Sequence, residues 1–197
     1  MPPLRLTIPL AAVAVAAVAA GAWFLTRTTT LRPASYAYEP TSALYTPIDT
    51  RTKDAAPLTT AEIFKDPAIG GLQRGATEEL TDCDEALSGV EATGCTQALR
   101  GTYTSPQVTG EFVIFNLADA RAADALVAAM RTSGFVRQAT PFDATRSRAQ
   151  ARALGHFVTV TWVGATQQGG NTPDLIPPLV ALDSLGHTLQ SRVISAT

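Results

Sequence analysis

The residues best suited to covalent or metal chemistry in this chain are two cysteines, Cys83 and Cys95, and two histidines, His156 and His187. The cysteine spacing is too long for a CxxC motif, and no histidine lies near it, which argues against a zinc site. An even number of cysteines in one short segment is typical of a disulfide in an oxidising compartment, with two free thiols in a cytosolic domain as the alternative. We therefore predict a Cys83–Cys95 disulfide and no metal site.

Motifs for nucleophilic catalysis and for cofactor binding are missing from the sequence. Ser88 stands in ALSGV and lacks the first glycine of a G-x-S-x-G turn. No HExxH motif, phosphate-binding loop or dinucleotide fingerprint occurs. His156 opens a predicted strand as a core or edge residue, and His187 falls away from the apolar face of a predicted helix. We expect no catalytic residue and no cofactor, so the chain is predicted not to be an enzyme.

Arginine is concentrated in one short stretch, ATRSRAQARALG, between two predicted strands. Residues 96–160 carry seven arginines against four acids, whereas residues 55–95 carry eight acids against one lysine and one arginine. One interpretation is a patch that binds an anionic envelope polymer, a lipid headgroup or an acidic protein face. The simpler interpretation is a solvated hairpin loop, paired with the acidic half. The candidate anion-binding residues are Arg137, Arg146, Arg148 and Arg152.

Two other polar stretches have simpler explanations than ligand binding. The acids between Glu78 and Glu85 lack the spacing of an EF-hand loop, and such charges are favourable at the N-terminus of a helix. Gly169-Gly170 precedes a predicted helix, whose backbone N–H groups could bind an anion. A flexible connector explains one such turn equally simply, so we assign neither stretch a ligand.

The N-terminal segment contains LTIPLAAVAVAAVAAGAWFLT, which has no charged side chain from Leu6 to Thr26. A helix of about 20 residues spans roughly 30 Å, enough to cross the hydrocarbon core of a bilayer. Two A-x-A sites, at residues 17–19 and 20–22, leave cleavage of a signal peptide as the alternative. Because the apolar run continues to Leu25, we favour a retained single-pass transmembrane anchor over residues 1–26.

Residues 27–57 are rich in proline and threonine and show no sustained apolar period. Such a segment buries too little surface to order itself, so we predict a disordered stalk that lifts a domain off the membrane. The alternative is a segment docked on the domain through Tyr36, Tyr38 and Tyr45.

Residues 58–197 predict an extracytoplasmic α+β domain with an antiparallel four-stranded sheet, covered on one face by helices in an αββαββα order. Capping residues predict helices beginning near Thr59 and Asp119, and a further helix over 84–93. Alternating and continuous apolar runs predict the strands, and the last helix carries Leu182, Leu185, Leu189 and Val193. The predicted strands cover residues 95–105, 110–117, 135–140 and 155–166, and the predicted core contains Phe115, Leu126, Val160 and Trp162.

The order of apolar run, Pro/Thr stalk and small domain with the stretch GCTQALRGTYTS resembles small single-pass envelope proteins of actinobacteria, many of unknown function. The resemblance implies a bacterial cell envelope location and no particular chemistry. We expect a binding or scaffolding domain, with an envelope hydrolase that lacks a recognisable motif, or a secreted protein freed by cleavage, as alternatives.

The expected partners follow from charge and placement. The N-terminal helix is expected to bind the membrane, and the domain to bind an anionic envelope component or another envelope protein. A net charge of −2 and a pI of about 5.6 give no basic signal for nucleic acid.

Overall fold

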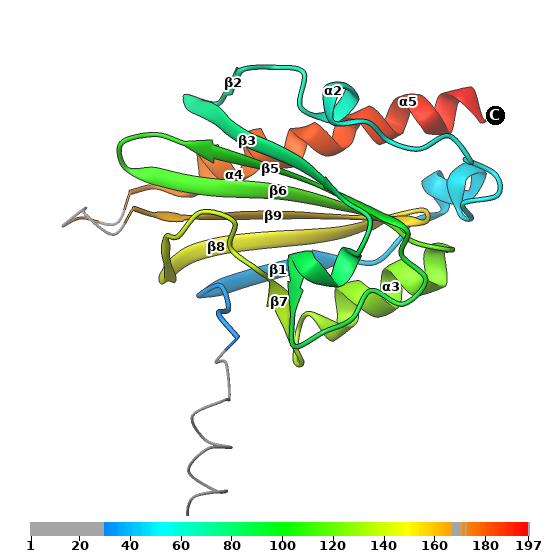
Figure 1. Ribbon diagram of the computed structural model, residues 1–197, viewed down its shortest axis with the longest axis horizontal. Helices are drawn as coiled ribbons and strands as arrows, with labels where there is room; N and C mark the ends of the chain where they lie inside the picture. Colours follow the sequence, from blue (N-terminus) through cyan, green and yellow to red (C-terminus); the bar gives the residue numbers. More distant parts are fainter. Residues whose placement is uncertain (1–29, 167–170, 172, 197) are drawn as a thin grey trace, which may run out of the picture. The chain divides into compact units, whose positions relative to one another are not determined.

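The structure is a computed structural model that describes residues 30–166, 171 and 173–196, and it contains a seven-stranded mixed sheet (Figure 1). The parallel pair β1–β8 forms one edge, and every other neighbouring pair is antiparallel. The predicted four-stranded antiparallel sheet and its αββαββα order are therefore wrong. The strands, in their order across the sheet, are β1 (Ser35–Glu39), β8 (Asp143–Leu154), β9 (Phe157–Ala165), β6 (Val108–Asn116), β5 (Gln97–Thr104), β3 (Leu72–Leu80) and β2 (Ala68–Ile69).

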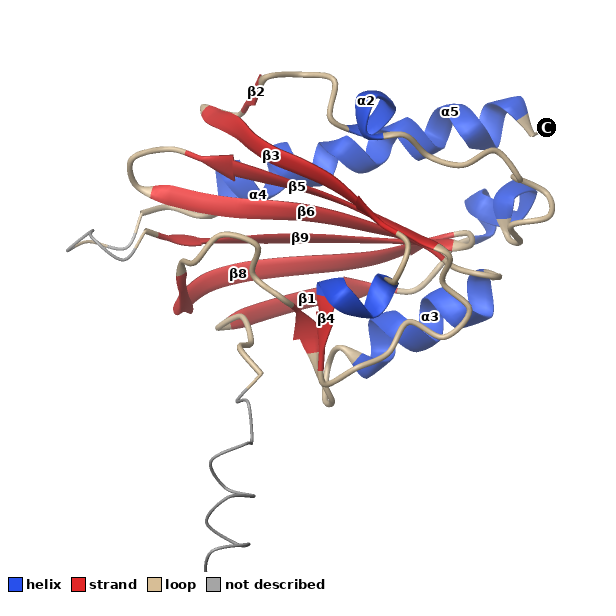
Figure 2. Cartoon of the chain, in the orientation of Figure 1, coloured by secondary structure: helices blue, strands red, loops and turns tan. Residues whose placement is uncertain are grey.

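Helices cover both faces of the sheet, whereas the sequence predicted one covered face (Figure 2). Helix α3 packs on one face together with the 3₁₀ helix η2 and the short β4–β7 pair. The other face is covered by α4, η3 and α5, with α2 and η1 beside them. The elements are η1 (Ala43–Ile48), α2 (Thr60–Ile63), η2 (Cys83–Ala86), β4 (Leu87–Ser88), α3 (Ala120–Ala129), β7 (Phe135–Val136), α4 (Ile176–Asp183), η3 (Ser184–His187) and α5 (Thr188–Ser195).

The first core, on the α3 face, confirms the predicted contacts of Phe115, Leu126, Val160 and Trp162. The Trp162 ring lies edge-on to the rings of Phe135 and Phe142, with centroid distances of 4.9 and 5.0 Å. Its Nε1 donates to Ser147 Oγ at 2.9 Å. An indole buried in this way keeps its apolar contacts and its one hydrogen bond.

Several local predictions are confirmed. The β5–β6 hairpin forms as predicted, and Asp119 Oδ1 accepts a hydrogen bond from the Ala122 N–H at 2.8 Å, which caps α3. Thr59 caps α2 by accepting from the Glu62 N–H at 3.1 Å. The four apolar residues predicted for the C-terminal helix are all buried.

Three other predictions are wrong. The expected helix over 84–93 is only the four-residue η2, followed by β4. The stretch predicted as an arginine-rich hairpin loop is the twelve-residue strand β8, and residues 72–80 form β3, which the sequence analysis missed. In β8, Ala149, Ala151 and Ala153 point into the first core and alternate with the half-buried Gln150 and Arg152. Alanine and arginine have low strand propensity, so the alternation gave a weak signal.

The predicted disordered stalk over 27–57 does not hold for its described part. Strand β1 pairs with β8 from Ser35↔Arg148 to Glu39↔Arg152, and Ile48 is fully buried in the second core. Tyr36 and Tyr45 pack against the two cores, as the docked alternative expected. The predicted anchor over residues 1–26 lies outside the described residues. Of the helices within the described ranges, none combines the length and apolarity needed to cross a bilayer.

Truncating Leu126, which is 3% exposed at the centre of the first core, should reduce the free energy of unfolding by about 2–5 kcal/mol in Leu126→Ala. Arg148→Ala is the control and should cost almost nothing, because its side chain is exposed. Denaturant unfolding measures both. Equal, small losses would mean that α3 does not pack on the sheet.

Candidate functional site

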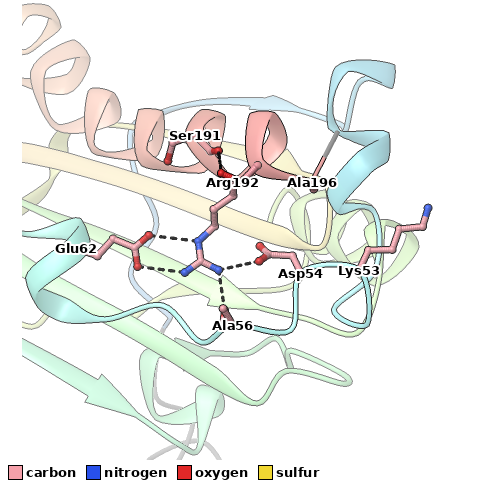
Figure 3. Close-up of a pocket in the computed structure, with 8 residues that line it drawn as sticks. Lys53, Asp54, Ala56, Glu62, Ser191, Arg192 and Ala196 are labelled. Carbon is pink, nitrogen blue, oxygen red and sulfur yellow. Dashed lines mark hydrogen bonds and ion pairs between the residues drawn. The ribbon is translucent and has the colours of Figure 1, made fainter.

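A polar pocket is formed by α5 and the chain before and within α2 (Figure 3). It is an open cavity of about 350 Å³, and acids, bases and hydroxyls share its wall. Such a mixture could in principle bind a small charged ligand. The lining residues are Lys53, Asp54, Ala56, Glu62, Ser191, Arg192, Ser195 and Ala196.

All five N–H donors of Arg192, at the centre of this pocket, form hydrogen bonds within the protein. Figure 3 shows those to Glu62, Asp54 and Ala56. Its Nε and one terminal nitrogen bind the two Glu62 carboxylate oxygens at 3.3 and 3.1 Å. The other terminal nitrogen binds Asp54 Oδ1 at 2.9 Å and the Ala56 carbonyl at 2.6 Å, and the Pro57 carbonyl accepts the fifth bond at 3.1 Å. A guanidinium has no further donor to offer, so this cluster holds α5 against residues 54–62.

Replacing Arg192 by methionine should therefore destabilise the fold by about 3 kcal/mol, because Asp54 and Glu62 lose the cation that compensates their partial burial. Lys53→Met is the matched control in the same pocket. Lys53 is half exposed and pairs with Asp49 at 2.8 Å, so its loss should cost less than 1 kcal/mol, about the value of a surface pair. Thermal unfolding measures the stability of the two variants. Equal losses of stability would contradict the role of Arg192 in holding α5.

His156 is fully buried, as the sequence predicted for a core position. Its Nδ1 lies 2.8 Å from the Ile48 carbonyl oxygen, which also accepts its backbone N–H at 3.0 Å. The carbonyl can only accept, so Nδ1 carries the proton, and burial lowers the pKa of the ring. The Nε2 atom has no hydrogen-bond partner among the described residues. A ring without exposed surface cannot reach a substrate, and this imidazole joins η1 to the β8–β9 turn. His187 is exposed, as predicted.

Glu111 is a buried acid that the sequence analysis did not single out. It is 1% exposed in β6, opposite Thr102 of β5 and Trp162 of β9. Its Oε2 accepts the Ala139 N–H at 2.9 Å, whereas Oε1 has no partner among the described residues. Burial raises the pKa of Glu111 to about 7, against smaller lowering effects of the Ala139 hydrogen bond and the Arg100 charge. The sequence signal that could have identified Glu111 was its position as the one acid in the apolar run GEFVIFN.

The raised pKa of Glu111 predicts a loss of stability as pH rises. Between about pH 4.5 and 7 the folded state binds the proton that the unfolded state has released, so the free energy of unfolding falls with pH. The full difference is on the order of 3 kcal/mol above pH 7. Glu111→Gln cannot titrate and should lack this fall.

Denaturant unfolding of the unsubstituted protein and of Glu111→Gln, at pH 5 and pH 8, measures this fall in the free energy of unfolding. Other titrating groups cancel in the difference between the two proteins, so parallel pH profiles would contradict a raised pKa at Glu111.

The predicted disulfide is present between Cys83 and Cys95, whose Cα atoms are 6.2 Å apart. It closes because η2 is short and the chain then reverses at Gly89 and Gly94, which have φ of 72° and 76°. Asp84 Oδ1 also accepts the Ala92 N–H at 2.9 Å across the loop. Disulfide and hydrogen bond together fix the loop 83–95 as one unit.

This loop and α3 enclose two open pockets of about 570 and 470 Å³, which share Glu91 and Ala129 in their walls. Alanines of α3 line one side, and the loop lines the other. Within the described ranges, no three His, Cys, Asp or Glu side chains are arranged to hold a metal ion. Charged side chains also line both pockets: Asp84, Glu91 and Arg137 the larger, and Glu91, Asp119 and Arg121 the smaller.

The four predicted anion-binding arginines are not gathered into one site. Arg146 pairs with Asp143 at 2.8 Å, and hydrogen bonds from Thr145 and Arg146 lower the pKa of that carboxyl to about 2. Arg152 pairs with Glu39 at 3.0 Å and with Asp183 at 2.8 Å. Arg137 follows β7 and donates to the Leu87 carbonyl. Arg148 is exposed and forms no ion pair with a described residue, so binding by the four arginines stays a prediction.

Comparisons of the chain with protein-family models, with curated proteins and with solved structures found no match.

Proposed function

We propose that the chain is a membrane-anchored extracytoplasmic binding or scaffolding domain of a bacterial cell envelope. The observation that carries this proposal is the Cys83–Cys95 disulfide, buried at the Cys83 end. Disulfides persist in oxidising compartments and are rare in the cytosol of most organisms, which supports a location beyond the membrane.

Binding is supported over catalysis by the way the domain uses its polar side chains. Arg192, in the polar pocket between α5 and α2, has all five donors engaged within the protein. His156 and Glu111, whose pKa values are shifted, are each 1% exposed or less. Hydrolysis needs an acid, base or nucleophile that reaches its substrate. An envelope hydrolase is therefore the weaker alternative.

The apolar run from Leu6 to Leu25 would provide the membrane anchor, in keeping with the resemblance to single-pass envelope proteins. Cleavage after one of its A-x-A sites would instead release the same domain as a secreted protein. The proposed partners are an anionic envelope component or another envelope protein. Nucleic acid is not proposed, because the net charge of −2 offers no electrostatic attraction to phosphate.

The location is tested in cells that express the full chain. Denaturing, non-reducing thiol labelling should leave both cysteines unlabelled, external protease should degrade the domain in spheroplasts with intact membranes, and the protein should stay in the membrane pellet after a high-salt wash.

The Cys83→Ser, Cys95→Ser double variant should be less stable by about 2–4 kcal/mol.

Full labelling of native protein would remove the case for an extracytoplasmic domain. A mature N-terminus at Ala20 or Trp23, read by sequencing, would show the secreted form instead of the anchored one.

A further inference from the structure

The free edge of the sheet at β1 carries an exposed group of apolar, aromatic and basic side chains, which we call the β1 edge surface: Leu31, Tyr38, Arg131 and Arg148. Leu31 is 53% exposed and Tyr38 is 39% exposed. The Arg131 guanidinium lies 4.7 Å from the centroid of the Tyr38 ring, on the α3 side of the sheet. Arg148 lies opposite Ser35, at the start of β1, and by strand alternation points to the other side, so the two arginines flank the edge. Figure 1 shows β1 at the lower edge of the sheet, with the C-terminal end of α3 beside it.

This surface has a net positive charge, because the cations near β1 (Arg32, Arg131, Arg148 and Arg152) outnumber the acids there (Glu39 and Asp124). Glu39 pairs with Arg152 at 3.0 Å, and Asp124 accepts the Thr41 N–H at 2.7 Å. Arg131 and Arg148 are both exposed, and neither forms an ion pair with a described residue. Leucine, tyrosine and arginine together are the side chains that favour the interface of a bilayer, where rings lie at headgroup level and cations meet lipid phosphate.

The start of the compact unit, which begins at Leu31, is held at this edge by several hydrogen bonds. The Arg32 guanidinium donates to the Gly134 carbonyl at 2.9 Å and to the Met130 and Arg131 carbonyls at 2.7 Å each. The Tyr36 hydroxyl donates to the Val127 carbonyl at 3.2 Å. These contacts attach the segment to the last turn of α3, so the chain enters the fold at Leu31 and not at the end of a long stalk.

Chain length then restricts how far this surface can lie from a membrane. Residues 27–30 alone separate the end of the apolar run at Thr26 from Leu31. Five Cα–Cα steps reach at most about 17 Å when fully extended. A domain anchored through residues 6–25 would therefore keep Leu31, at one end of the β1 edge surface, within about 17 Å of the bilayer, and a disordered stalk of 31 residues would not.

We propose that the β1 edge surface docks on the bilayer that holds the anchor, with Leu31 and Tyr38 at headgroup level and Arg131 and Arg148 binding anionic lipid phosphate. This inference rests on the proposed membrane anchor. It makes the anionic envelope component a lipid headgroup and gives the domain one fixed orientation, with the faces that carry α3 and α4–α5 roughly perpendicular to the membrane.

The test uses the full chain reconstituted into liposomes whose lipids are brominated near the headgroup, so that a nearby indole loses fluorescence. Tyr38→Trp reports the β1 edge, and Ile194→Trp is the matched control. Ile194 is 75% exposed in α5, which lies away from β1 beyond the other side of the sheet (Figure 1). The unsubstituted protein supplies the background of its own two tryptophans. Quenching should be stronger for Tyr38→Trp than for Ile194→Trp, and stronger with anionic than with zwitterionic lipid.

Charge removal makes the second arm of the test. In the Tyr38→Trp protein, Arg131→Gln and Arg148→Gln should each weaken docking about fivefold, as expected for about 1 kcal/mol per arginine near an anionic surface. Arg121→Gln, which removes an exposed arginine from the opposite end of α3, should leave the quenching unchanged.

Each contrary result has its own meaning. Protein that fails to remain with the liposomes after a high-salt wash overturns the anchor itself. Anchored protein with equal quenching at the two reporter positions overturns the docking and leaves the anchor intact. Equal quenching in anionic and zwitterionic lipid, or equal effects of the three arginine substitutions, overturns the assignment to lipid phosphate. Quenching that disappears on dilution of protein in the bilayer assigns the edge to a second copy of the chain instead.

Discussion

The fold depends on the burial of both faces of its central strands. Every residue of β6 and β9 is buried, so the sheet must be covered on two sides. Helix α3, η2 and the β4–β7 pair supply one cover, and α4, η3 and α5 supply the other. The remaining contacts secure these covers: Arg32 holds the C-terminal end of α3, and Arg192 holds α5 to the segment before α2. A guanidinium suits both tasks, because one planar group satisfies several carbonyl or carboxylate oxygens at once.

The same requirement explains why the segment before Leu58 is ordered. Its proline content and polarity are typical of a chain that cannot fold alone, and nothing in its own composition contradicts that. The sheet supplies the missing partners: β8 offers a free edge to β1, and the second core takes Ile48. The consequence reaches function, because a domain that begins at Leu31 would be held close to a membrane by the predicted anchor. The β1 edge surface, which a long stalk would have held away from the membrane, is then the one that we propose to face the lipid.

The polar side chains with unusual environments mostly serve the fold. His156 connects η1 to the β8–β9 turn, and Glu111 holds the backbone after β7 through the Ala139 N–H. A buried carboxyl with one hydrogen bond is costly once ionised, which ties the stability of the domain to pH. The disulfide also serves the fold, because it fixes the loop 83–95 beside α3. Two exposed cations that form no ion pair with a described residue, Arg131 and Arg148, lie elsewhere, at the β1 edge, and that separation supports binding at a surface over chemistry in a pocket.

Local chemistry determined what the sequence could predict. The Cys83–Cys95 pair, the β5–β6 hairpin, the Asp119 cap and the four core residues around Trp162 follow from spacing, turn residues and apolar periodicity. Tertiary structure decided the rest. Strand β8 is built from alanine and arginine, which carry little strand signal, and β1 is a strand only because it pairs with β8 more than 100 positions away, as Ser35↔Arg148. The acids of residues 78–85 favoured a helix terminus, yet two of the five, Glu78 and Glu79, lie on β3, which pairs antiparallel with β5. Pairing distant segments costs loop-closure entropy, which burial in the finished sheet offsets. No local sequence pattern shows which distant segments will pair.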